Sequence, residues 1–440
     1  MKNQKLLDLA DWLISVGKKN GVDEISIVIA KSKQSSFEVR KGEIDLLEGA
    51  EESSLALSLY IDDKFSVNRT SVFDKESLKN FLETSVNLTQ QLNKDEYRAL
   101  PEPSLYWKEE PLDIEIEDKK YLDITPETKK KIAIDLERKT RKISKNIVSV
   151  TSSYSDSFSE MIKVNSNGFV GEKISTSFSV GSEVVVKGEG GALPSDWFYS
   201  YTRMFEDTPD LDIIAENSVR MAEAKIGQKK IASGNYSMIV SNRVASKLIG
   251  MILSSITGSK LWNKNTFLDG KLDKKIFSDK LTIIDEPYIK RGLGSKLFDA
   301  DGFKTKKRVL IEDGVLQYYL LNNYFAKKLN LSPTTGSTSN ICLKSGKSDI
   351  LDMIKGLNSG ILVNSFLGGN FNSTSGDFSF GISGNLIENG ELTKPVNEMN
   401  ITGNAVELFN RLLEVGNDPY LYSSYRIPSL FFENVSFNGL

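Results

Sequence analysis

Residues 159–187 read SEMIKVNSNGFVGEKISTSFSVGSEVVVK, two strand-like stretches joined by a turn. Apolar and polar residues alternate in both stretches, which is the period of a half-buried strand. Between them, Asn165-Ser166-Asn167-Gly168 is a strong hairpin signal. We therefore predict strands at about 159–165 and 172–187, with a further strand at 147–154.

Helices are expected before and after these strands in the sequence. At about 125–143, an N-cap threonine precedes a proline that suits the first helical position. A second helix is expected at about 211–226. We group these elements as a middle domain, residues 121–228. Residues 99–120 contain prolines among acidic residues, a composition typical of a linker.

The N-terminal stretch, residues 3–98, is predicted to be a small α+β domain. Its first helix should end at Lys18-Lys19-Asn20-Gly21, where basic residues precede a pair suited to a left-handed cap. Strand-like alternation begins at Ile25, and Asp74 is a good N-cap for a closing helix.

Residues 233–440 are richer in strand and turn signals. One helix is expected after Asn242, its predicted N-cap, because apolar residues recur there at helical spacing. No repeat of fixed period is present, so a solenoid or propeller is not indicated. The predicted fold class is α+β and multi-domain: a small N-terminal α+β domain, a middle region of helices and strands, and a strand-rich C-terminal domain.

The composition restricts the classes of function. The 440 residues carry 56 Lys and Arg against 59 Asp and Glu, a net charge of −3, so a protein that coats nucleic acid or anionic lipid is not expected. The single cysteine, Cys342, fits a reducing compartment. The N-terminus does not resemble an export signal, and no apolar run is long enough for a membrane span. We expect a cytoplasmic protein with no membrane and no nucleic-acid partner.

The chain contains no histidine. This excludes a histidine general base, a Ser-His or Cys-His nucleophile and a histidine zinc site made by this chain alone. It also leaves no residue type that ordinarily titrates between about pH 5 and 8. We therefore expect stability to vary little with pH across that range.

Residues for metal-independent hydrolysis are sparse. Ser15 to Lys18 satisfies a Ser-x-x-Lys pattern, but on a predicted surface helix. Ser278 to Lys280 and Ser345 to Lys347 are shorter matches of the kind that chance supplies. Carboxylate pairs such as Asp62-Asp63 and Glu109-Glu110 fall in predicted turns or in the linker.

A series of short segments runs in a defined order along the chain. These are Val39–Ile44, Tyr60–Lys64, Asn165–Gly171, Ser175–Ser177, Leu293–Ser295, Phe298–Gly302, Glu312–Gln317, Gly376–Gly384, Ile387–Glu391 and Pro395–Val396. Each is short, but the ordered set covers nearly the whole chain. It resembles the TldD/TldE (PmbA) family, and its TldE or PmbA branch in particular.

The resemblance implies a cytoplasmic peptidase system of two related subunits that acts on unfolded or short peptides. In the TldD-type subunit, a helix carries a His-Glu-x-x-x-His metal motif, with zinc as the expected metal, and the C-terminal domain adds a further ligand. The TldE-type subunit pairs with it and lacks the metal site. Aligned by Gly258, the motif positions fall on Ile249, Gly250 and Ser254. The resemblance therefore implies no cofactor in this chain and a TldD-like partner that holds the metal.

A metal-free subunit can still contribute strand edges that hold an extended peptide. Glycine permits close approach of a backbone, which makes the glycine-containing strands near the C-terminus candidates for the wall of such a groove. The candidates are Gly368, Gly369, Asn370, Gly376, Asp377, Phe378 and Ser379. A sheet core with tight turns would explain the same residues.

Two other functions stay open. One is a metal-independent hydrolase that uses serine and lysine or a carboxylate. The other is a non-catalytic binding or scaffold protein. A TldD-like chain with an intact His-Glu-x-x-x-His motif in the same genome would favour the subunit over both.

Overall fold

The computed structural model of the chain describes residues 4–110 and 112–440. Its α-helices are α1 (Gln4–Lys19), α2 (Lys75–Gln90), α3 (Pro126–Arg141), α4 (Leu211–Glu223), α5 (Asn242–Ser255), α6 (Gly258–Trp262), α7 (Asn323–Leu329), α8 (Ile350–Lys355) and α9 (Ala405–Asn410). Its strands are β1 (Glu24–Arg40), β2 (Glu43–Ile61), β3 (Lys64–Thr70), β4 (Ile147–Asn165), β5 (Val170–Val186), β6 (Ser195–Thr202), β7 (Gly234–Val240), β8 (Ile283–Glu286), β9 (Arg308–Glu312), β10 (Val315–Leu316), β11 (Asn340–Leu343), β12 (Ser359–Phe371), β13 (Asp377–Glu388), β14 (Glu391–Asn404), β15 (Leu412–Val415), β16 (Tyr425–Arg426) and β17 (Leu430–Asn438). Within these described ranges, no helix has the length and apolar character needed to cross a membrane.

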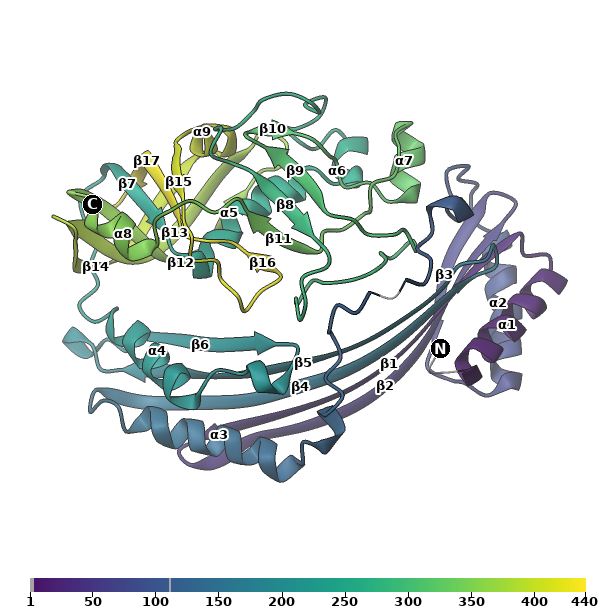
Figure 1. The fold of residues 1–440 in the computed structure, drawn as a ribbon, viewed down its shortest axis with the longest axis horizontal. Coiled ribbons are helices and arrows are strands. Elements are labelled where there is room, and N and C mark those ends of the chain that lie inside the picture. Colours follow the sequence, from purple (N-terminus) through teal and green to yellow (C-terminus); the bar gives the residue numbers. More distant parts are fainter. Residues whose placement is uncertain (1–3, 111) are drawn as a thin grey trace.

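A long, curved antiparallel sheet of order β3-β2-β1-β4-β5-β6 fills the lower part of Figure 1; we call it the long sheet. Its strand β1 pairs with β2 on one side and with β4 on the other. The β1–β4 register runs without a break from Ser26 opposite Asn165 to Arg40 opposite Thr151. The strands expected in the N-terminal and middle stretches therefore meet in one sheet.

Tight turns connect neighbouring strands of the long sheet. Asp62 and Asp63, between β2 and β3, have φ angles of 51° and 61°. Two successive positive φ angles are typical of the type I′ turn, whose twist matches that of the strands. The turn predicted at Asn165–Gly168 is confirmed, with Gly168 N–H donating to the Asn165 carbonyl oxygen at 3.0 Å. Asp62-Asp63 thus has a conformational role in a turn.

The strands predicted at 147–154 and 159–165 are one continuous strand, β4, so the predicted break is wrong. The polar residues in between include Asp156, which is buried. Its carboxylate accepts hydrogen bonds from the hydroxyls of Tyr121 and Tyr154, both at 2.8 Å. A buried polar group with its hydrogen bonds made does not interrupt a strand.

Two helix pairs cover one face of the long sheet at its opposite ends (Figure 1). Ile25, Ile27 and Ile29 of β1 belong to a core formed with α1 and α2. Phe37 and Val39 of the same strand belong to a second core, formed with α3 and α4. All five are odd-numbered residues of a strand whose side chains alternate between faces. One strand face therefore anchors both helix pairs.

The C-terminal body, residues 233–440, lies above the long sheet in Figure 1. It contains a sheet of order β10-β9-β8-β11-β16 and another of order β14-β13-β12-β7-β17-β15. Strand β14 also pairs with β17, so the second sheet closes partly on itself. Helix α5 packs in the core of this body through residues such as Leu248 and Ile252, both fully buried. The predicted α+β, multi-domain fold class is confirmed.

Residues 99–120 are predicted as a linker, and the described parts, 99–110 and 112–120, run between the long sheet and the C-terminal body (Figure 1). Trp107 N–H donates to the Gly302 carbonyl oxygen at 2.9 Å, which attaches the linker to the C-terminal body. The Tyr106 hydroxyl donates to the Asn167 side chain at 2.8 Å, at the turn between β4 and β5. The linker therefore contacts both halves of the molecule.

Candidate functional site

Helix α5 carries the positions that align with the family's metal motif. Ser241 is its N-cap, and Asn242, which we predicted as the cap, is its first residue. The Asn242 amide donates to the Asp418 carbonyl oxygen at 2.7 Å. Arg243 forms an ion pair with Asp196 of β6 at 2.8 Å. These contacts fix the start of α5 between the long sheet and the C-terminal body.

The three aligned positions differ in their surroundings. Ile249 is fully buried in the core of the C-terminal body. A Cβ atom added at Gly250 would meet no atom within 4 Å, so this position borders open space. Ser254 is exposed, and its hydroxyl donates to the Met251 carbonyl oxygen at 3.0 Å. A hydrocarbon, a glycine and this hydroxyl do not fit zinc, which binds thiolate, imidazole or carboxylate ligands. In residues 4–110 and 112–440, no three Cys, Asp or Glu side chains gather as a possible metal site.

The groove candidates lie together at one end of the hairpin formed by β12 and β13. Asn370 stands opposite Ser379, and Gly369 stands opposite Phe380. The exposed members of the set are Gly368, Gly369, Asn370, Asp377 and Ser379, and the buried members are Gly376 and Phe378. Phe378 stacks on Phe380 in the core, so the hairpin combines an outward polar surface with an apolar interior.

Asp377 is the ionisable member of this set. Its carboxylate accepts a hydrogen bond from the Asn404 amide at 3.0 Å. Hydrogen bonds from Ser375 and Asn404 lower the pKa of the Asp377 carboxyl. A carboxyl with a lowered pKa is ionised at neutral pH and is poorly suited to act as a general acid.

Lys247 connects α5 with the hairpin. Its ammonium nitrogen lies 5.0 Å from the centre of the Phe380 ring. Phe380 in turn packs edge-on against Phe366 of β12, with ring centres 5.6 Å apart. Lys247, Gly250 and Ser254 follow each other at spacings of three and four residues, so they share one helix face. The outer face of α5 therefore neighbours the glycine-containing end of β12.

Strand β12 has an unpaired edge at this end. Among the strands that the structure describes, β7 pairs with β12 only as far as Val363, whereas β12 continues to Phe371. Strand β13 occupies the other side of β12. Backbone N–H and C=O groups of an unpaired edge can accept an added peptide strand. The geometry of residues 364–371 is therefore compatible with an extended peptide.

The serine hydroxyls and lysine ammonium groups considered for the alternative hydrolase do not form a catalytic dyad. Ser15 is exposed on α1, and the Lys18 ammonium donates to the Asp23 carbonyl oxygen. The Ser278 hydroxyl donates to the Leu412 carbonyl oxygen at 3.2 Å. These contacts hold Lys18 and Ser278 to backbone carbonyl groups rather than to a reactive partner.

The other candidate residues are exposed, are held in an ion pair, or lack the lowered pKa of an activated nucleophile. Ser345 and Lys347 are exposed in the segment after β11. Glu110 forms an ion pair with Lys304. Burial raises the pKa of the Cys342 thiol, which is the opposite of the lowered pKa that activates a catalytic thiolate.

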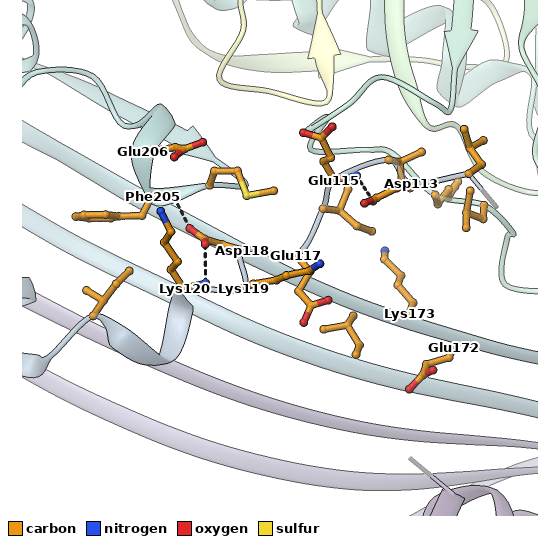
Figure 2. A pocket seen from close by; sticks show the side chains of 18 of the residues that line it. Asp113, Glu115, Glu117, Asp118, Lys119, Lys120, Glu172, Lys173, Phe205 and Glu206 are labelled. Carbon is orange, nitrogen blue, oxygen red and sulfur yellow. Dashed lines mark hydrogen bonds between the residues drawn. The ribbon is translucent and has the colours of Figure 1, made fainter. Parts of the chain in front are cut away.

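The structure adds a feature that sequence reasoning missed, a cavity of about 950 Å³ between the linker, β5 and the C-terminal body (Figure 2). We call it the interdomain cavity. Its lining includes residues 112–120, 172–174, 204–206 and 296–298. These segments are far apart in the sequence, and none of them carries a recognisable motif. Only their tertiary arrangement creates the cavity.

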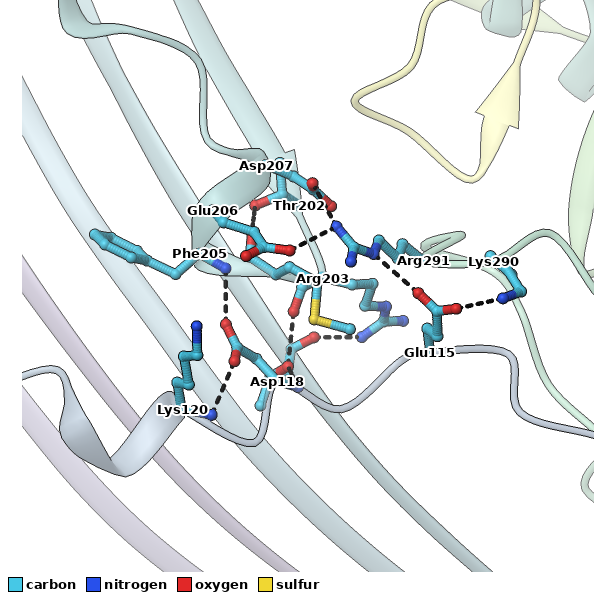
Figure 3. A network of polar contacts seen from close by, with 12 residues as sticks. Glu115, Asp118, Lys120, Thr202, Arg203, Phe205, Glu206, Asp207, Lys290 and Arg291 are labelled. Carbon is cyan, nitrogen blue, oxygen red and sulfur yellow. Dashed lines mark hydrogen bonds and ion pairs between the residues drawn. The ribbon is translucent and has the colours of Figure 1, made fainter.

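An ion-pair network stands beside the interdomain cavity (Figure 3). Glu115 contacts Lys290 at 2.5 Å and Arg291 at 3.1 Å. Arg291 also contacts Glu206 at 3.0 Å and Asp207 at 2.8 Å. Hydrogen bonds from the two cations lower the pKa of Glu115. The network joins the linker to the C-terminal body and to the segment after β6.

Comparison with known proteins gives a consistent result. Residues 119–226 match the family model described as the PmbA/TldA metallopeptidase central domain, and residues 233–439 match that of the C-terminal domain. The chain is 25% identical to the metalloprotease PmbA homolog of Haemophilus influenzae, over 100% of this chain and 97% of that protein. It is also 25% identical to metalloprotease PmbA of Escherichia coli O157:H7, over 97% and 94% of the two chains.

Solved structures extend this likeness. A Bacteroides thetaiotaomicron protein described as a proposed modulator of DNA gyrase is 39% identical, with a TM-score of 0.97 over 100% of both chains. TldE from Thermococcus kodakarensis has the same fold, with 23% identity and a TM-score of 0.88 over 98% of this chain and 100% of that one. Because both family models match and a full-length relative shares well over a third of its residues, the chain belongs to the TldD/PmbA (TldE) family.

Proposed function

We propose that this chain is the metal-free subunit of a TldD/TldE-type metallopeptidase that acts in the cytoplasm on unfolded or short peptides. The observation that carries the proposal is the identity of Ile249, Gly250 and Ser254 at the aligned motif positions, in a chain that otherwise matches the family along its length. Relatives of this chain are named metalloproteases. In this proposal the zinc belongs to a TldD-like partner.

The division of labour follows from the chemistry of zinc hydrolysis. The metal must hold a water molecule at an open coordination position, and the peptide must lie extended beside it. The first task needs ligands that α5 does not carry at the aligned positions. The second needs a backbone edge and free space, which residues 364–371 of β12 and the surroundings of Gly250 offer. We therefore assign this chain the task of holding the peptide.

The proposal is tested by mixing the untagged chain with a TldD-like chain from the same genome. The tag matters because a polyhistidine sequence would introduce the imidazoles that this chain lacks. Size-exclusion chromatography should show a mixed oligomer, and a stable pair should bury well over about 1,000 Å². Hydrolysis of an unfolded peptide should appear only in the mixture and disappear with a chelator.

Other results would favour the alternatives. Chelator-resistant hydrolysis by the purified chain alone would indicate a serine–lysine or carboxylate hydrolase. Failure to associate with the TldD-like chain, with no hydrolysis in the mixture, would favour a binding or scaffold protein.

A further inference from the structure

Lys173 of β5 directs its ammonium group into the interdomain cavity (Figure 2). Burial, followed by the positive charges of Arg203 and Lys296, lowers the pKa of Lys173. Three cations therefore stand near one another in a region partly removed from water. Like charges in such a region repel, and a bound anion would stabilise them.

The two neighbouring cations are held by uncharged acceptors. Arg203 donates to the carbonyl oxygens of Thr176 at 2.9 Å and Leu293 at 2.5 Å. Lys296, which also lines the cavity, donates to the Thr338 carbonyl oxygen at 2.7 Å. Carbonyl groups orient these cations without neutralising them. Burial is the larger effect on Lys296 and lowers its pKa, although Asp285 and Asp299 act to raise it. After burial, the charges of Arg203 and Lys296 in turn help to lower the pKa of Lys173.

Eight carboxylates and four lysines line the cavity, so an anion would be accepted only where the lysines stand. Several of the carboxylates are bound elsewhere. Glu115 pairs with Lys290 and Arg291 in the network described above. Asp118 accepts hydrogen bonds from two backbone N–H groups, each at 2.9 Å. Figure 2 shows the Glu172 carboxylate turned away from the Lys173 ammonium. Among the ion pairs of the described residues, none is made by Lys173 or Lys296, so the proposal concerns the part of the wall next to these two lysines.

The rest of the lining is strongly apolar. It includes Ile114, Ile116, Ile174, Met204, Leu297 and Phe298. A volume of about 950 Å³ lies at the upper end of the range of about 300–1,000 Å³ typical of small-molecule sites. A small hydrated anion such as phosphate would leave these apolar walls unfilled. An anion that carries an apolar body would use both parts of the lining.

We propose that the interdomain cavity binds an organic carboxylate with an apolar body, and that the carboxylate contacts the ammonium of Lys173. Two sources supply this chemistry: the C-terminus of a short peptide and a free carboxylic acid. The peptide source rests on the proposed function, whereas the free-acid source does not.

The test is isothermal titration calorimetry on the untagged chain without any partner. The probes are N-acetyl-Leu-Phe with a free C-terminus, the same peptide as its C-terminal amide, and decanoate. We expect saturable binding of at least one of the two acids. If the peptide acid binds, its amide should bind at least tenfold more weakly, because the amide has no charge to place beside Lys173. Binding of only one acid identifies the source of the carboxylate.

Variants locate the contact. Lys173→Met should weaken binding of the acid at least tenfold, and Lys173→Arg should largely retain it. Lys187→Met, an exposed lysine just beyond the end of β5, serves as the matched control and should leave binding unchanged. Thermal unfolding of each variant checks that it is folded.

Three results would overturn the proposal. They are no binding of either acid, equal binding of the peptide acid and its amide, and undiminished binding by folded Lys173→Met. The comparison of acid with amide needs no variant, so it decides the matter even if a substitution prevents folding. If only decanoate binds, decanamide is the matched neutral probe, and equal binding of the two would likewise overturn the proposal. Because no peptidase partner is present, failure here is separate from failure of the proposed function.

Discussion

Lys129 and Asp156 form a buried ion pair in which Lys129 Nζ lies 2.6 Å from Asp156 Oδ2. Lys129 belongs to α3 and Asp156 to β4, so the pair fastens a helix to the long sheet. The same carboxylate accepts the hydroxyl hydrogen bonds of Tyr121 and Tyr154. A charged group removed from water depends on such partners.

Lys129→Met should therefore destabilise the protein strongly. It leaves the Asp156 carboxylate buried without its cation, a change that typically costs about 3–5 kcal/mol. Lys130→Met, at the exposed neighbouring position of α3, is the matched control and should change stability by no more than about 0.5 kcal/mol. Denaturant unfolding gives both values. A loss below about 1 kcal/mol for Lys129→Met would show that the pair contributes little.

Gly369 and Gly368 should respond differently to alanine. Both have positive φ angles, 112° and 101°, which strain any residue with a side chain. A Cβ at Gly369 would also clash with the carbonyl oxygen of Ser379, whereas a Cβ at Gly368 would meet nothing within 4 Å. Gly369→Ala should cost about 1–3 kcal/mol more than Gly368→Ala in denaturant unfolding. Equal losses of stability in the two variants would mean that the close approach of β12 and β13 does not set the cost of a side chain at Gly369.

Gly250 offers a test of the space beside α5. Gly250→Ala should preserve activity and stabilise the helix by up to about 1 kcal/mol, because alanine is a better helix former. Gly250→Trp should fill the open space near the edge of β12 and raise the KM of the proposed two-subunit enzyme for an unfolded peptide several-fold. Steady-state kinetics on the mixed oligomer measures this. If the Gly250→Trp variant folds and associates with its partner but the KM is unchanged, the peptide binds elsewhere.

Asp299 revises the flat pH profile that the absence of histidine predicts. Burial, and next the negative charge of Asp301, raises the pKa of Asp299 to about 6. This value lies above the unfolded value of about 3.9, so the folded state holds the proton more tightly. The resulting stability is fully present below about pH 4 and is lost as the pH rises through about 6.

The free energy of unfolding should therefore fall by about 1 kcal/mol between pH 5 and 7. Asp299→Asn should flatten that change. The Asp301 and Phe303 N–H groups donate to one oxygen of Asp299, and an asparagine oxygen can accept both bonds. Denaturant unfolding at pH 5, 6 and 7 measures the effect. An equal slope in the variant would assign the pH dependence to another group.

Local chemistry explains which elements the sequence could predict. The turn at Asn165–Gly168 and the Asp74 cap of α2, which accepts a hydrogen bond from Ser77 N–H, depend on residues a few positions apart. The pairing of Ile29 with Ile162, which joins β1 to β4, was not predictable. Alternation shows that each residue lies in a strand, but it does not show which strands are neighbours.

The candidate site likewise has parts that the sequence predicts and parts that only the fold shows. The aligned positions Ile249, Gly250 and Ser254 were predicted by family resemblance, while the nearness of α5 to the hairpin of β12 and β13 is seen only in the fold, through the contact of Lys247 with Phe380. Lys173 gave no signal, because a lysine in an alternating strand normally faces solvent. Its position in a cavity depends on the linker and on residues 296–298, which pack over it only in the folded chain.

The most direct test of the metal-free assignment treats the two subunits of the proposed enzyme separately. Each purified, untagged subunit is incubated with a chelator, freed of the chelator by gel filtration, and mixed with its untreated counterpart. Hydrolysis of an unfolded peptide is then measured. We predict that treating the TldD-like subunit abolishes hydrolysis and that added zinc restores it, while treating this chain changes nothing. Loss of activity after treatment of this chain alone, restored by zinc, would contradict the account, because it would place an essential metal in a chain without histidine.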